Sequence, residues 1–355
     1  MRRKKILFVN SNQFGYHTDY LYFAKYLSHT FSIDYICYDR KRDRIELTGI
    51  NIIYLDFPRY RIYRSIYFLQ KTLAHIRENE FDIVFADYFK LVFFIGFFGK
   101  CKNSILDIRT GSLKKSSLLR YIENLFIHIA TKSFKITTIL SEGLADKLKL
   151  KKYNLLPLGA ESYFYGNHKF NELNLLYVGA LNQRNIKETI EGLYLFTCKH
   201  QSVKVTYDII GFGNDDDIGT INETIKKYGL DNIVKFNGRK TKSDLIPFFA
   251  KCNIGVSYVP ITPWYDNQPP TKTFEYVLSG MACIATATTE NKKFVNNING
   301  ILCQDNSASF SLALKLIWQN RDKYISEAIR SSLSDYTWEK ITTKKLIPIL
   351  QEMTN

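Results

Sequence analysis

Short apolar runs alternate with longer helical patterns along almost the whole chain, and this alternation constrains the fold more than any other feature. Runs rich in β-branched and aromatic residues predict strands at 6–10, 33–38, 52–55, 83–86, 105–108 and 136–140. Between some of them, the spacing of apolar residues predicts helices, as at 19–28 and 64–78. Strands and helices in this order are typical of parallel sheets covered by helices.

The same alternation starts again in the second half of the chain. Further strands are predicted at 175–179, 205–211, 233–236, 254–259, 283–287 and 301–302, with helices at 186–196, 218–228, 271–279 and 310–318. A single hydrophobic core stops growing near ~250–300 residues, so 355 residues favour two domains. We therefore predict an α/β protein with two Rossmann-like, doubly wound domains that face a central cleft, where a ligand would bind outside the carboxyl ends of the strands.

The predicted domain boundaries follow from where this periodicity stops. Residues 1–160 form the first domain, and 161–172 are a polar, aromatic stretch without periodicity that we interpret as a linker. Residues 173–335 form the second domain. Residues 336–355 are predicted as a C-terminal helix that can cross back to the first domain.

Charge is distributed unevenly over these domains. The chain has 49 Lys and Arg against 34 Asp and Glu, a net charge of +15. Residues 1–160 hold 27 and 14 of them, a net +13, and residues 161–355 hold 22 and 20, a net +2. A one-sided positive field points to nucleic acid, an anionic membrane surface or an anionic substrate, or it is merely a soluble basic surface.

Several classes of protein are excluded by simple observations. The six cysteines are scattered without a CxxC pair or clustered His, which argues against a zinc site or a disulfide framework and favours a reduced, cytosolic compartment. The basic start is followed by an apolar run too short for a signal peptide. The run LVFFIGFF at 91–98 is far shorter than the ~20 residues that span a bilayer.

The most informative stretch is 256–287, VSYVPITPWYDNQPPTKTFEYVLSGMACIATA. A strand ends near Val259, a Pro-rich loop follows, and Thr271 is predicted to cap a helix that begins with Lys272 and contains Glu275. Unpaired N–H groups and the positive dipole end make such a helix start a site for an anion such as a diphosphate. Glu275 can accept hydrogen bonds from the vicinal hydroxyls of a ribose. The alternative is a solvated helix whose first turn satisfies only its own cap.

A second constellation is the segment LYVGALNQRNIK at 176–187, which reads as a strand, a loop opened by Gly179, and a helix led by Arg184. Arg184 would stand at the carboxyl end of the first strand of the second domain, where a guanidinium can hold phosphate oxygens bidentately. Gly211 in DIIGFGN and Arg239 in FNGR follow the next two strands, although glycines at strand ends are often required by the turn alone.

Two loops of the first domain are further candidates. Gly15, after the first strand, permits close backbone approach to a ligand, but its loop lacks GxGxxG, which disfavours a nicotinamide or flavin site. Asp107 and Arg109 end another strand, where they can bind an acceptor or simply pair with each other. No Ser-His-Asp spacing, nucleophile elbow or Walker loop occurs, and the six histidines are isolated.

These residues together resemble the family-4 retaining glycosyltransferases (glycosyl transferases group 1), which have the GT-B fold of two Rossmann-like domains. The resemblance rests on LYVGALNQRNIKETIEGL, DIIGFGN, VKFNGRKTKSDLIPFFAKCNIGVSYVP, PPTKTFEYVLSGMACIATATTEN and NGILCQDN. It extends to TTILSEGL, LLPLGAES and SDYTWEKI, and so covers nearly the whole chain.

The resemblance implies a nucleoside-diphosphate sugar as donor, bound mainly by the second domain. Of the family's two glutamates, the ribose-binding one corresponds to Glu275 and the one that contacts the sugar falls on Asn267. The family's basic pair is matched by Arg184 alone, because its second member falls on Ala180, and Lys272 can restore that charge. The candidate catalytic residues are thus Arg184, Lys272 and Glu275. The candidate donor-binding residues are Gly15, Gly179, Gly211, Arg239, Asn267, Pro270, Thr271 and Thr273.

The resemblance also implies that neither a cofactor nor a metal is required, because basic side chains and a helix N-terminus neutralise the departing diphosphate. The reaction would keep the anomeric configuration. Asp107 and Arg109 would lie on the acceptor side.

Two segments of the basic half interleave cations with apolar residues, RYRIYRSIYF at 59–68 and LKKSSLLRYIENLFIHIATKSFK at 113–135. Such segments fit a membrane interface, where each cation near anionic lipid contributes about 1 kcal/mol. The predicted membrane-facing cations are Arg59, Arg61, Arg64, Lys114, Lys115 and Arg120. As an alternative, the apolar positions at 118, 122 and 126 are an ordinary core face.

The sequence therefore predicts a cytoplasmic transferase, peripherally associated with the inner face of the membrane, that moves a sugar to a lipid-linked or saccharide acceptor in capsular, exo- or lipopolysaccharide synthesis. Nucleic acid is not an expected partner. Two alternatives are a nonhydrolysing nucleotide-sugar epimerase of the same architecture and a basic nucleic-acid-binding protein.

Overall fold

The computed structural model describes residues 2–99, 102–112, 116–263 and 265–354, and it divides the chain into two compact units. The first unit comprises Met1–Gly159 together with Trp338–Asn355, and the second comprises Ala160–Thr337. The C-terminal segment thus belongs to the same unit as the N-terminal one.

The first unit contains a seven-stranded sheet whose order is β3-β2-β1-β4-β5-β6-β7, with every neighbouring pair parallel. Its strands are β1 (Lys5–Val9), β2 (Ser32–Asp39), β3 (Ile50–Asp56), β4 (Ile83–Asp87), β5 (Ser104–Ile108), β6 (Ile136–Ile139) and β7 (Asn154–Leu155). The order reverses between β1 and β4, which is the switch point of a doubly wound sheet.

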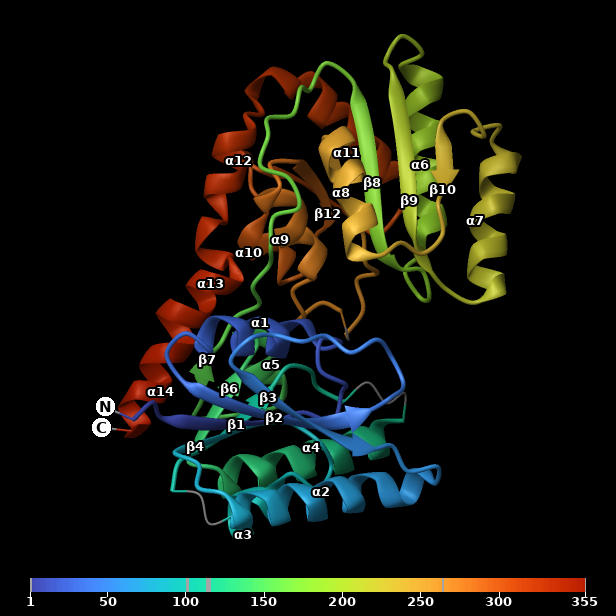
Figure 1. Cartoon of the computed structure of the whole chain (residues 1–355). Coiled ribbons are helices and arrows are strands. Elements are labelled where there is room, and N and C mark those ends of the chain that lie inside the picture. The colour runs from blue at the N-terminus through green and yellow to red at the C-terminus, as the bar shows by residue number, and fades with distance from the viewer. Residues whose placement is uncertain (1, 100–101, 113–115, 264, 355) are drawn as a thin grey trace. The chain divides into compact units, whose positions relative to one another are not determined.

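Helices cover both faces of this sheet. They are α1 (Thr18–Leu27), α2 (Arg61–Glu78), α3 (Phe93–Phe98), α4 (Ser117–Ser133), α5 (Glu142–Lys147), α13 (Trp338–Ile341) and α14 (Ile347–Thr354), with a π-helical turn at Thr342–Leu346. Within the unit, α2, α3 and α4 lie together on one side of the sheet, and α1 and α5 lie on the other (Figure 1).

The second unit contains a six-stranded parallel sheet of order β10-β9-β8-β11-β12-β13. The strands are β8 (Leu173–Ala180), β9 (Val205–Phe212), β10 (Val234–Phe236), β11 (Ile254–Ser257), β12 (Ala282–Thr286) and β13 (Gly300–Cys303). The helices are α6 (Ile186–Lys199), α7 (Asp215–Lys227), α8 (Lys242–Lys251), α9 (Thr271–Leu278), α10 (Asn291–Phe294), α11 (Ser307–Gln319) and α12 (Ser326–Ser332), with 3-10 turns at Arg321–Lys323 and Ser334–Tyr336.

Strand β8 of this unit lies between β9 and β11, so its switch point falls between β8 and β11. All of the strands predicted from the sequence are present in both units, most within two residues of their predicted ends. The structure adds α3, in the apolar run for which the sequence suggested no helix.

The return of the chain to the first unit is fixed by Trp338, which is fully buried. Its ring stacks on Tyr22 and meets the edge of Phe23, each at a centroid distance of 5.6 Å. A Cβ at Gly159 would lie 2.6 Å from Trp338 Cε3, so only glycine leaves room for this ring. Burial of a Trp side chain contributes several kcal/mol, about 3–5 by analogy with truncation to Ala.

The stretch 161–172, predicted as a linker, has no helix or strand but is packed onto the second unit. The Tyr163 N–H donates to Ser279 Oγ at 3.0 Å, and the His168 N–H donates to Ser326 Oγ at 2.8 Å. These contacts join the segment to the ends of α9 and α12. The division between the units therefore falls before this segment, after Gly159.

Candidate functional site

The switch point of the second unit places the loop after β11 and the start of α9 beside the loop after β8. Helix α9 begins at Thr271, one residue before the predicted start, and Pro270 is its N-cap. Proline offers no side-chain acceptor, so no side-chain cap covers the first-turn N–H groups. The Thr273 N–H donates to the Pro270 carbonyl at 3.1 Å, and the start of α9 otherwise keeps the uncapped, positive dipole end that suits an anion.

Lys272, in the first turn of α9, has a buried ammonium group. The residue as a whole is half-exposed, but Nζ itself is inaccessible and has no hydrogen-bond partner. It lies 3.9 Å from the ring centroid of Tyr177 in β8, a cation–π contact. Burial, aided by the charge of Arg184, lowers the pKa of Lys272 to about 7.

Gly179 makes room for this ammonium. Its φ is +153°, a conformation that residues with a side chain rarely adopt, and a Cβ there would lie 2.8 Å from Lys272 Nζ. The Tyr177 hydroxyl donates to the Ala180 carbonyl at 2.6 Å, which holds the ring beneath the lysine. Gly179, which the sequence predicts as a donor-binding residue, thus leaves the space that the Lys272 ammonium occupies.

Arg184 is the second cation of this group. Its guanidinium stacks on Tyr265 at 4.0 Å from the ring centroid, and its Nη1 is buried without a hydrogen-bond partner. The loop that presents it has left-handed backbone at Gln183 (φ 55°) and Asn185 (φ 51°), the N-cap of α6. Two unpartnered cationic groups therefore approach one another beside the uncapped start of α9.

Glu275 lies one turn into α9 and is half-buried. Its carboxylate accepts a hydrogen bond from the Tyr163 side chain, and the charges of Lys242 and Lys272 act on it. Burial is the larger effect and raises the pKa of Glu275 to about 7. Tyr163 is itself held by stacking on Phe249 at 4.3 Å.

The other predicted donor-binding residues of the second unit differ in how they are used. The Thr273 hydroxyl points into the core, where it bonds Ser257 Oγ at 2.7 Å and Asn291 Oδ1 at 3.0 Å. A Cβ at Gly211 would lie 2.1 Å from the Gly179 carbonyl oxygen, so the close approach of two strands explains this glycine. Arg239 is exposed and lies over the Phe212 ring at 5.3 Å.

Asn267 lies in the loop before α9, and its neighbour Asp266 fixes that loop. Asp266 accepts from the Thr289 N–H at 2.8 Å and from the Thr289 hydroxyl at 2.7 Å. Asn267 is half-buried in this loop. The sequence showed no sign of Tyr177 and Tyr265, which lie under Lys272 and Arg184, or of Tyr163, which donates to Glu275, because no local pattern marks an aromatic residue as the partner of a distant charged group.

In the first unit, Asp107 and Arg109 form a buried ion pair, with Arg109 Nε 2.8 Å from Asp107 Oδ2. Arg109 also lies 3.2 Å from Asp19 Oδ2 and donates to the Leu156 carbonyl at 2.7 Å. The pairing that the sequence left as an alternative is therefore present. Gly15, in the same unit, has φ +89°, and a Cβ there would lie 2.3 Å from Ile45 Cδ1, so local packing explains the glycine.

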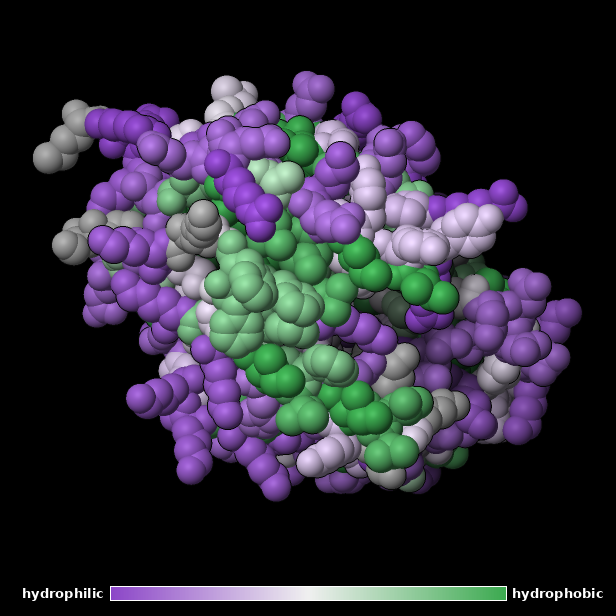
Figure 2. All heavy atoms as spheres, turned by 90° about the horizontal axis from the view of Figure 1, so that it is seen from below, coloured by the Kyte–Doolittle hydropathy of each residue, from purple (hydrophilic) through white to green (hydrophobic). Residues whose placement is uncertain are grey.

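Helices α2, α3 and α4 present a contiguous apolar surface, which we call the underside patch (Figure 2). Its exposed members are Tyr60, Ile62, Tyr63, Ile66, Phe97, Phe98, Leu118, Leu119, Tyr121, Ile122 and Leu125. Leu118 is 66% exposed and Ile122 is 40% exposed, so these two are not core residues, whereas Phe126 is half-buried.

The predicted membrane-facing cations that the structure describes differ in exposure and contacts. Arg59 and Arg61 are exposed, and Arg120 is half-buried. Arg64 donates to the carbonyls of Pro58 and Arg59 and stacks on Phe57 at 4.1 Å, so it holds the start of α2 in place. Lys114 and Lys115 lie outside the described residues.

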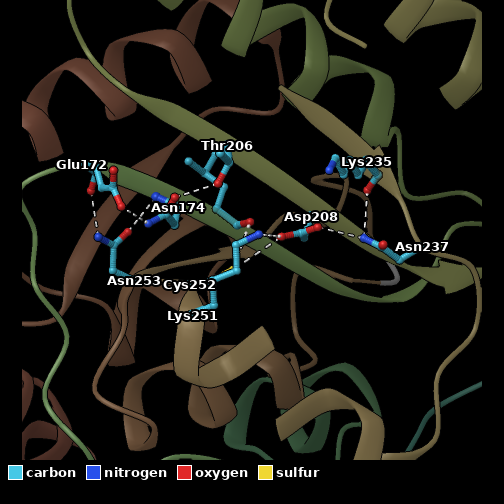
Figure 3. A network of polar contacts seen from close by, with 10 residues as sticks. Glu172, Asn174, Thr206, Asp208, Lys235, Asn237, Lys251, Cys252 and Asn253 are labelled. Atoms are coloured by element: carbon cyan, nitrogen blue, oxygen red, sulfur yellow. Dashed lines mark hydrogen bonds and ion pairs between the residues drawn. The ribbon is translucent and has the colours of Figure 1, made fainter. Parts of the chain in front are cut away.

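A polar network in the amino-terminal half of the second sheet is separate from these candidates (Figure 3). Asp208 in β9 accepts from Lys251 Nζ at 2.8 Å and from Asn237 Nδ2 at 2.9 Å. Asn253 accepts from the Asn174 N–H at 2.9 Å. The network joins β8, β9 and β10 to the end of α8, and we interpret it as structural.

Two further findings concern metals and membranes. Within the ranges that the structure describes, no group of three or more His, Cys, Asp and Glu side chains is arranged to hold a metal ion. None of the helices in those ranges combines the length and apolarity that crossing a bilayer requires.

Comparison with known proteins agrees with this geometry. Residues 172–320, which include the candidate donor site, match the family described as glycosyl transferases group 1. No curated protein matches the sequence significantly.

Solved structures match the whole chain. HepE of Anabaena in complex with UDP has a TM-score of 0.78 and 13% identity, over 99% of this chain and 100% of that one. A glycosyltransferase from Rickettsia africae has a TM-score of 0.76 and 16% identity, over 99% of both chains. WaaG, a glycosyltransferase involved in lipopolysaccharide biosynthesis, has a TM-score of 0.70 and 13% identity, over 99% of this chain and 100% of that one. The protein has the GT-B fold, as the sequence predicted. The predicted resemblance to the group 1 glycosyltransferases is confirmed for residues 172–320.

Proposed function

We propose that the protein is a glycosyltransferase of family 4 that takes a sugar from a nucleoside-diphosphate sugar. One observation carries this proposal: Lys272 and Arg184 hold buried, unpartnered cationic atoms beside the uncapped start of α9. Buried donors without partners are rare in proteins, and a diphosphate would supply the missing acceptors. HepE was solved with UDP and with UDP-glucose, which supports a donor of this kind.

The proposed chemistry needs only the groups of this site and an acceptor hydroxyl. The bond between the sugar's anomeric carbon and the diphosphate oxygen breaks, and a bond from that carbon to the acceptor oxygen forms on the same face. The acceptor's proton passes to the departing diphosphate. Lys272, Arg184 and the helix N-terminus would stabilise the negative charge that develops there, which is why we propose that no metal is required.

Two departures from the family pattern bear on this proposal. Ala180 has no charge to offer, and Lys272 lies close enough to Gly179 to supply a cation at the same point of the loop. Asn267 offers an amide in place of the family's carboxylate, so its contact with the sugar would lack a negative charge. We place Glu275 against the ribose hydroxyls, with Tyr163 orienting its carboxylate.

We further propose a lipid-linked or saccharide acceptor and a place at the inner face of the cytoplasmic membrane. The underside patch joins three helices into one apolar surface, and Arg59 and Arg61 lie at its edge. Monomeric proteins rarely expose so large an apolar surface without a partner. Apolar side chains beside cations match the acyl boundary and headgroups of an anionic bilayer. We propose synthesis of cell-surface polysaccharide or lipopolysaccharide as the process, and WaaG, a structurally similar glycosyltransferase, is involved in lipopolysaccharide biosynthesis.

A thermal-shift screen with nucleoside-diphosphate sugars tests the donor proposal, because a ligand that binds the folded state raises its melting temperature. We expect at least one nucleotide sugar to stabilise the protein and to transfer its radiolabelled sugar to a membrane extract. Glu275→Ala should abolish most of the shift, whereas Glu223→Ala, at an exposed position of α7, should leave it intact. The proposal fails if no nucleotide sugar binds and no label is transferred.

A further inference from the structure

The first unit contains a second cluster of polar side chains, at the carboxyl ends of its own strands around the β1/β4 switch point. Asn10 follows β1, Asp87 ends β4, and Asp107 lies in β5. Helix α1 brings His17 and Asp19 to the same place. Histidine spacing in the sequence did not reveal this cluster, because its members come from four separate elements.

The cluster contains more carboxyl groups than cations. Arg109 is already engaged by Asp107 at 2.8 Å and Asp19 at 3.2 Å. Asp87 is left with His17, whose Nδ1 lies 3.7 Å from Asp87 Oδ2. That Nδ1 is also 2.6 Å from Asn10 Nδ2. Because an amide nitrogen only donates, Nδ1 accepts and the ring carries its proton on Nε2.

Burial shifts the pKa of both groups at the accessible edge of the cluster, His17 and Asp87. Burial raises the pKa of Asp87 well above its usual value, and the charge of Asp107 raises it further. Burial and the charge of Arg109 lower the pKa of His17 to about 4. At neutral pH His17 is therefore a neutral imidazole whose Nε2–H can donate a hydrogen bond, and the oxygens of the Asp87 carboxyl group can accept one.

Two buried polar atoms behind this pair have no partner. The Tyr20 hydroxyl is unpartnered on a fully buried side chain, and Nη2 is unpartnered on Arg109, which is 8% exposed. The charges that act on Tyr20 are those of Asp107, Asp87 and Arg109, so its hydroxyl faces the cluster. Buried polar groups are nearly always satisfied, and unsatisfied ones indicate a missing water or ligand.

The accessible edge of the cluster is formed by His17, with 22% of its side chain exposed, and Asp87, with 16%. Because three carboxyl groups outnumber the one guanidinium, the cluster has no surplus positive charge to offer a phosphate, and its hydrogen-bond donors and acceptors suit hydroxyl groups instead. We propose that His17 and Asp87, backed by Tyr20 and Arg109, form a subsite for the hydroxyl groups of a saccharide acceptor. This rests on the proposed function, and it means that any phosphate of the acceptor is bound elsewhere.

The test uses the full chain with decyl glucoside, decyl galactoside and decyl phosphate as probes. In wild type we expect label to move from the nucleotide sugar to at least one decyl glycoside, and decyl phosphate to compete weakly. Asp87→Asn and His17→Asn should each raise the KM for the glycoside about tenfold, the loss expected for a hydrogen bond. Donor binding in the thermal-shift assay should be unchanged. Asp146→Asn, at an exposed position of α5, is the matched control.

Two variants are used in case Asp87→Asn fails to fold. His17 is partly exposed and its replacement leaves the buried carboxyl groups unchanged, so His17→Asn still tests the subsite. Unchanged KM in both variants, no binding of any glycoside, or stronger competition by decyl phosphate would overturn the subsite. If no nucleotide sugar binds wild type, the proposed function fails instead. Loss of direct glycoside binding in Asp87→Asn, seen by saturation-transfer NMR, would then still support the subsite.

Discussion

Aromatic rings keep the two key cations of the second unit in place without neutralising them. Tyr177 lies under Lys272, and Tyr265 lies under Arg184. A cation–π contact stabilises a charge by about 0.5–2 kcal/mol and consumes none of its hydrogen-bond donors. The donors thus stay available for a ligand, as a preorganised anion site requires.

The pKa of Lys272 predicts how binding depends on pH. Without ligand it is lowered to about 7, and a diphosphate beside the ammonium would raise it. Above pH 7 the amine must then take up a proton to bind, so affinity for a nucleotide sugar should fall by up to about tenfold per pH unit. Calorimetry between pH 7 and 9, in buffers of different ionisation enthalpy, should show this proton uptake.

Lys272→Arg is the control, because arginine stays charged throughout this range. Its binding should lose the pH dependence, whereas Lys272→Met should bind weakly at every pH. The stability of the unliganded protein should change in the opposite sense, rising with pH between about 7 and 10.5, because there the unfolded lysine holds a proton that the folded one lacks. A pH-independent affinity in wild type would contradict a lysine contact with the diphosphate.

At the scale of elements, the sheet of the second unit is stabilised by an ion pair in its amino-terminal half and has the candidate donor site at its carboxyl ends. Asp208 is 3% exposed in β9, and Lys251 at the end of α8 reaches it from the surface. A buried carboxylate that loses its cation is strongly disfavoured, more so than a neutral amide in the same place. The effects of replacing Asp208 and Lys251 on the free energy of unfolding should therefore not be additive, and the double variant should lose less than the sum of the two single variants.

We expect Lys251→Met to destabilise the protein by about 1–3 kcal/mol, because it leaves a buried charge without its partner. Asp208→Asn should cost less, and adding it to Lys251→Met should recover part of the loss. Urea unfolding of the two single variants and the double variant measures this cycle. Strictly additive effects, or an accompanying loss of nucleotide-sugar binding, would show that the network has another role.

At the scale of the whole molecule, net charge and exposed apolar area coincide in the first unit. Residues 1–160 carry the net +13, and the underside patch lies on three helices of that unit. The polar cluster at the carboxyl ends of the same sheet is acidic. In the described part of the chain, Arg109 is the one cation among the three carboxyl groups of this cluster, so the excess positive charge of the unit lies elsewhere on it. In our proposal, attraction to a membrane and recognition of an acceptor would therefore use different parts of the unit.

Flotation with liposomes tests the membrane proposal. The protein should float with vesicles that contain phosphatidylglycerol and stay at the bottom with pure phosphatidylcholine, and salt should weaken binding through screening. Replacing Ile62 and Leu118 together by Ser should abolish flotation, whereas Leu312→Ser, an exposed leucine of α11, should not. If the double variant instead converts a dimer to a monomer while flotation persists, the patch is an interface between copies.

Local information in the sequence was sufficient to predict the strands and the division into two domains, and to name Lys272, Arg184 and Glu275 as candidate site residues. Neighbouring residues determine the periodicity of strands and helices, the glycines at strand ends and the start of a helix. These features can therefore be predicted without a structure. The same holds for Asp107 and Arg109, two positions apart on one strand. The structure confirms the strands and the GT-B fold.

Tertiary structure decided which side chains meet and which face water. The rings beneath Lys272 and Arg184 come from a strand and a distant loop. The cluster of His17, Asp87 and Asp107 is assembled by the order of the strands and by the start of helix α1. An amphipathic pattern predicts that a helix has an apolar stripe, but in α4 part of that stripe faces outward. Burial and pKa depend on the whole surroundings of a group, and only the folded chain supplies them.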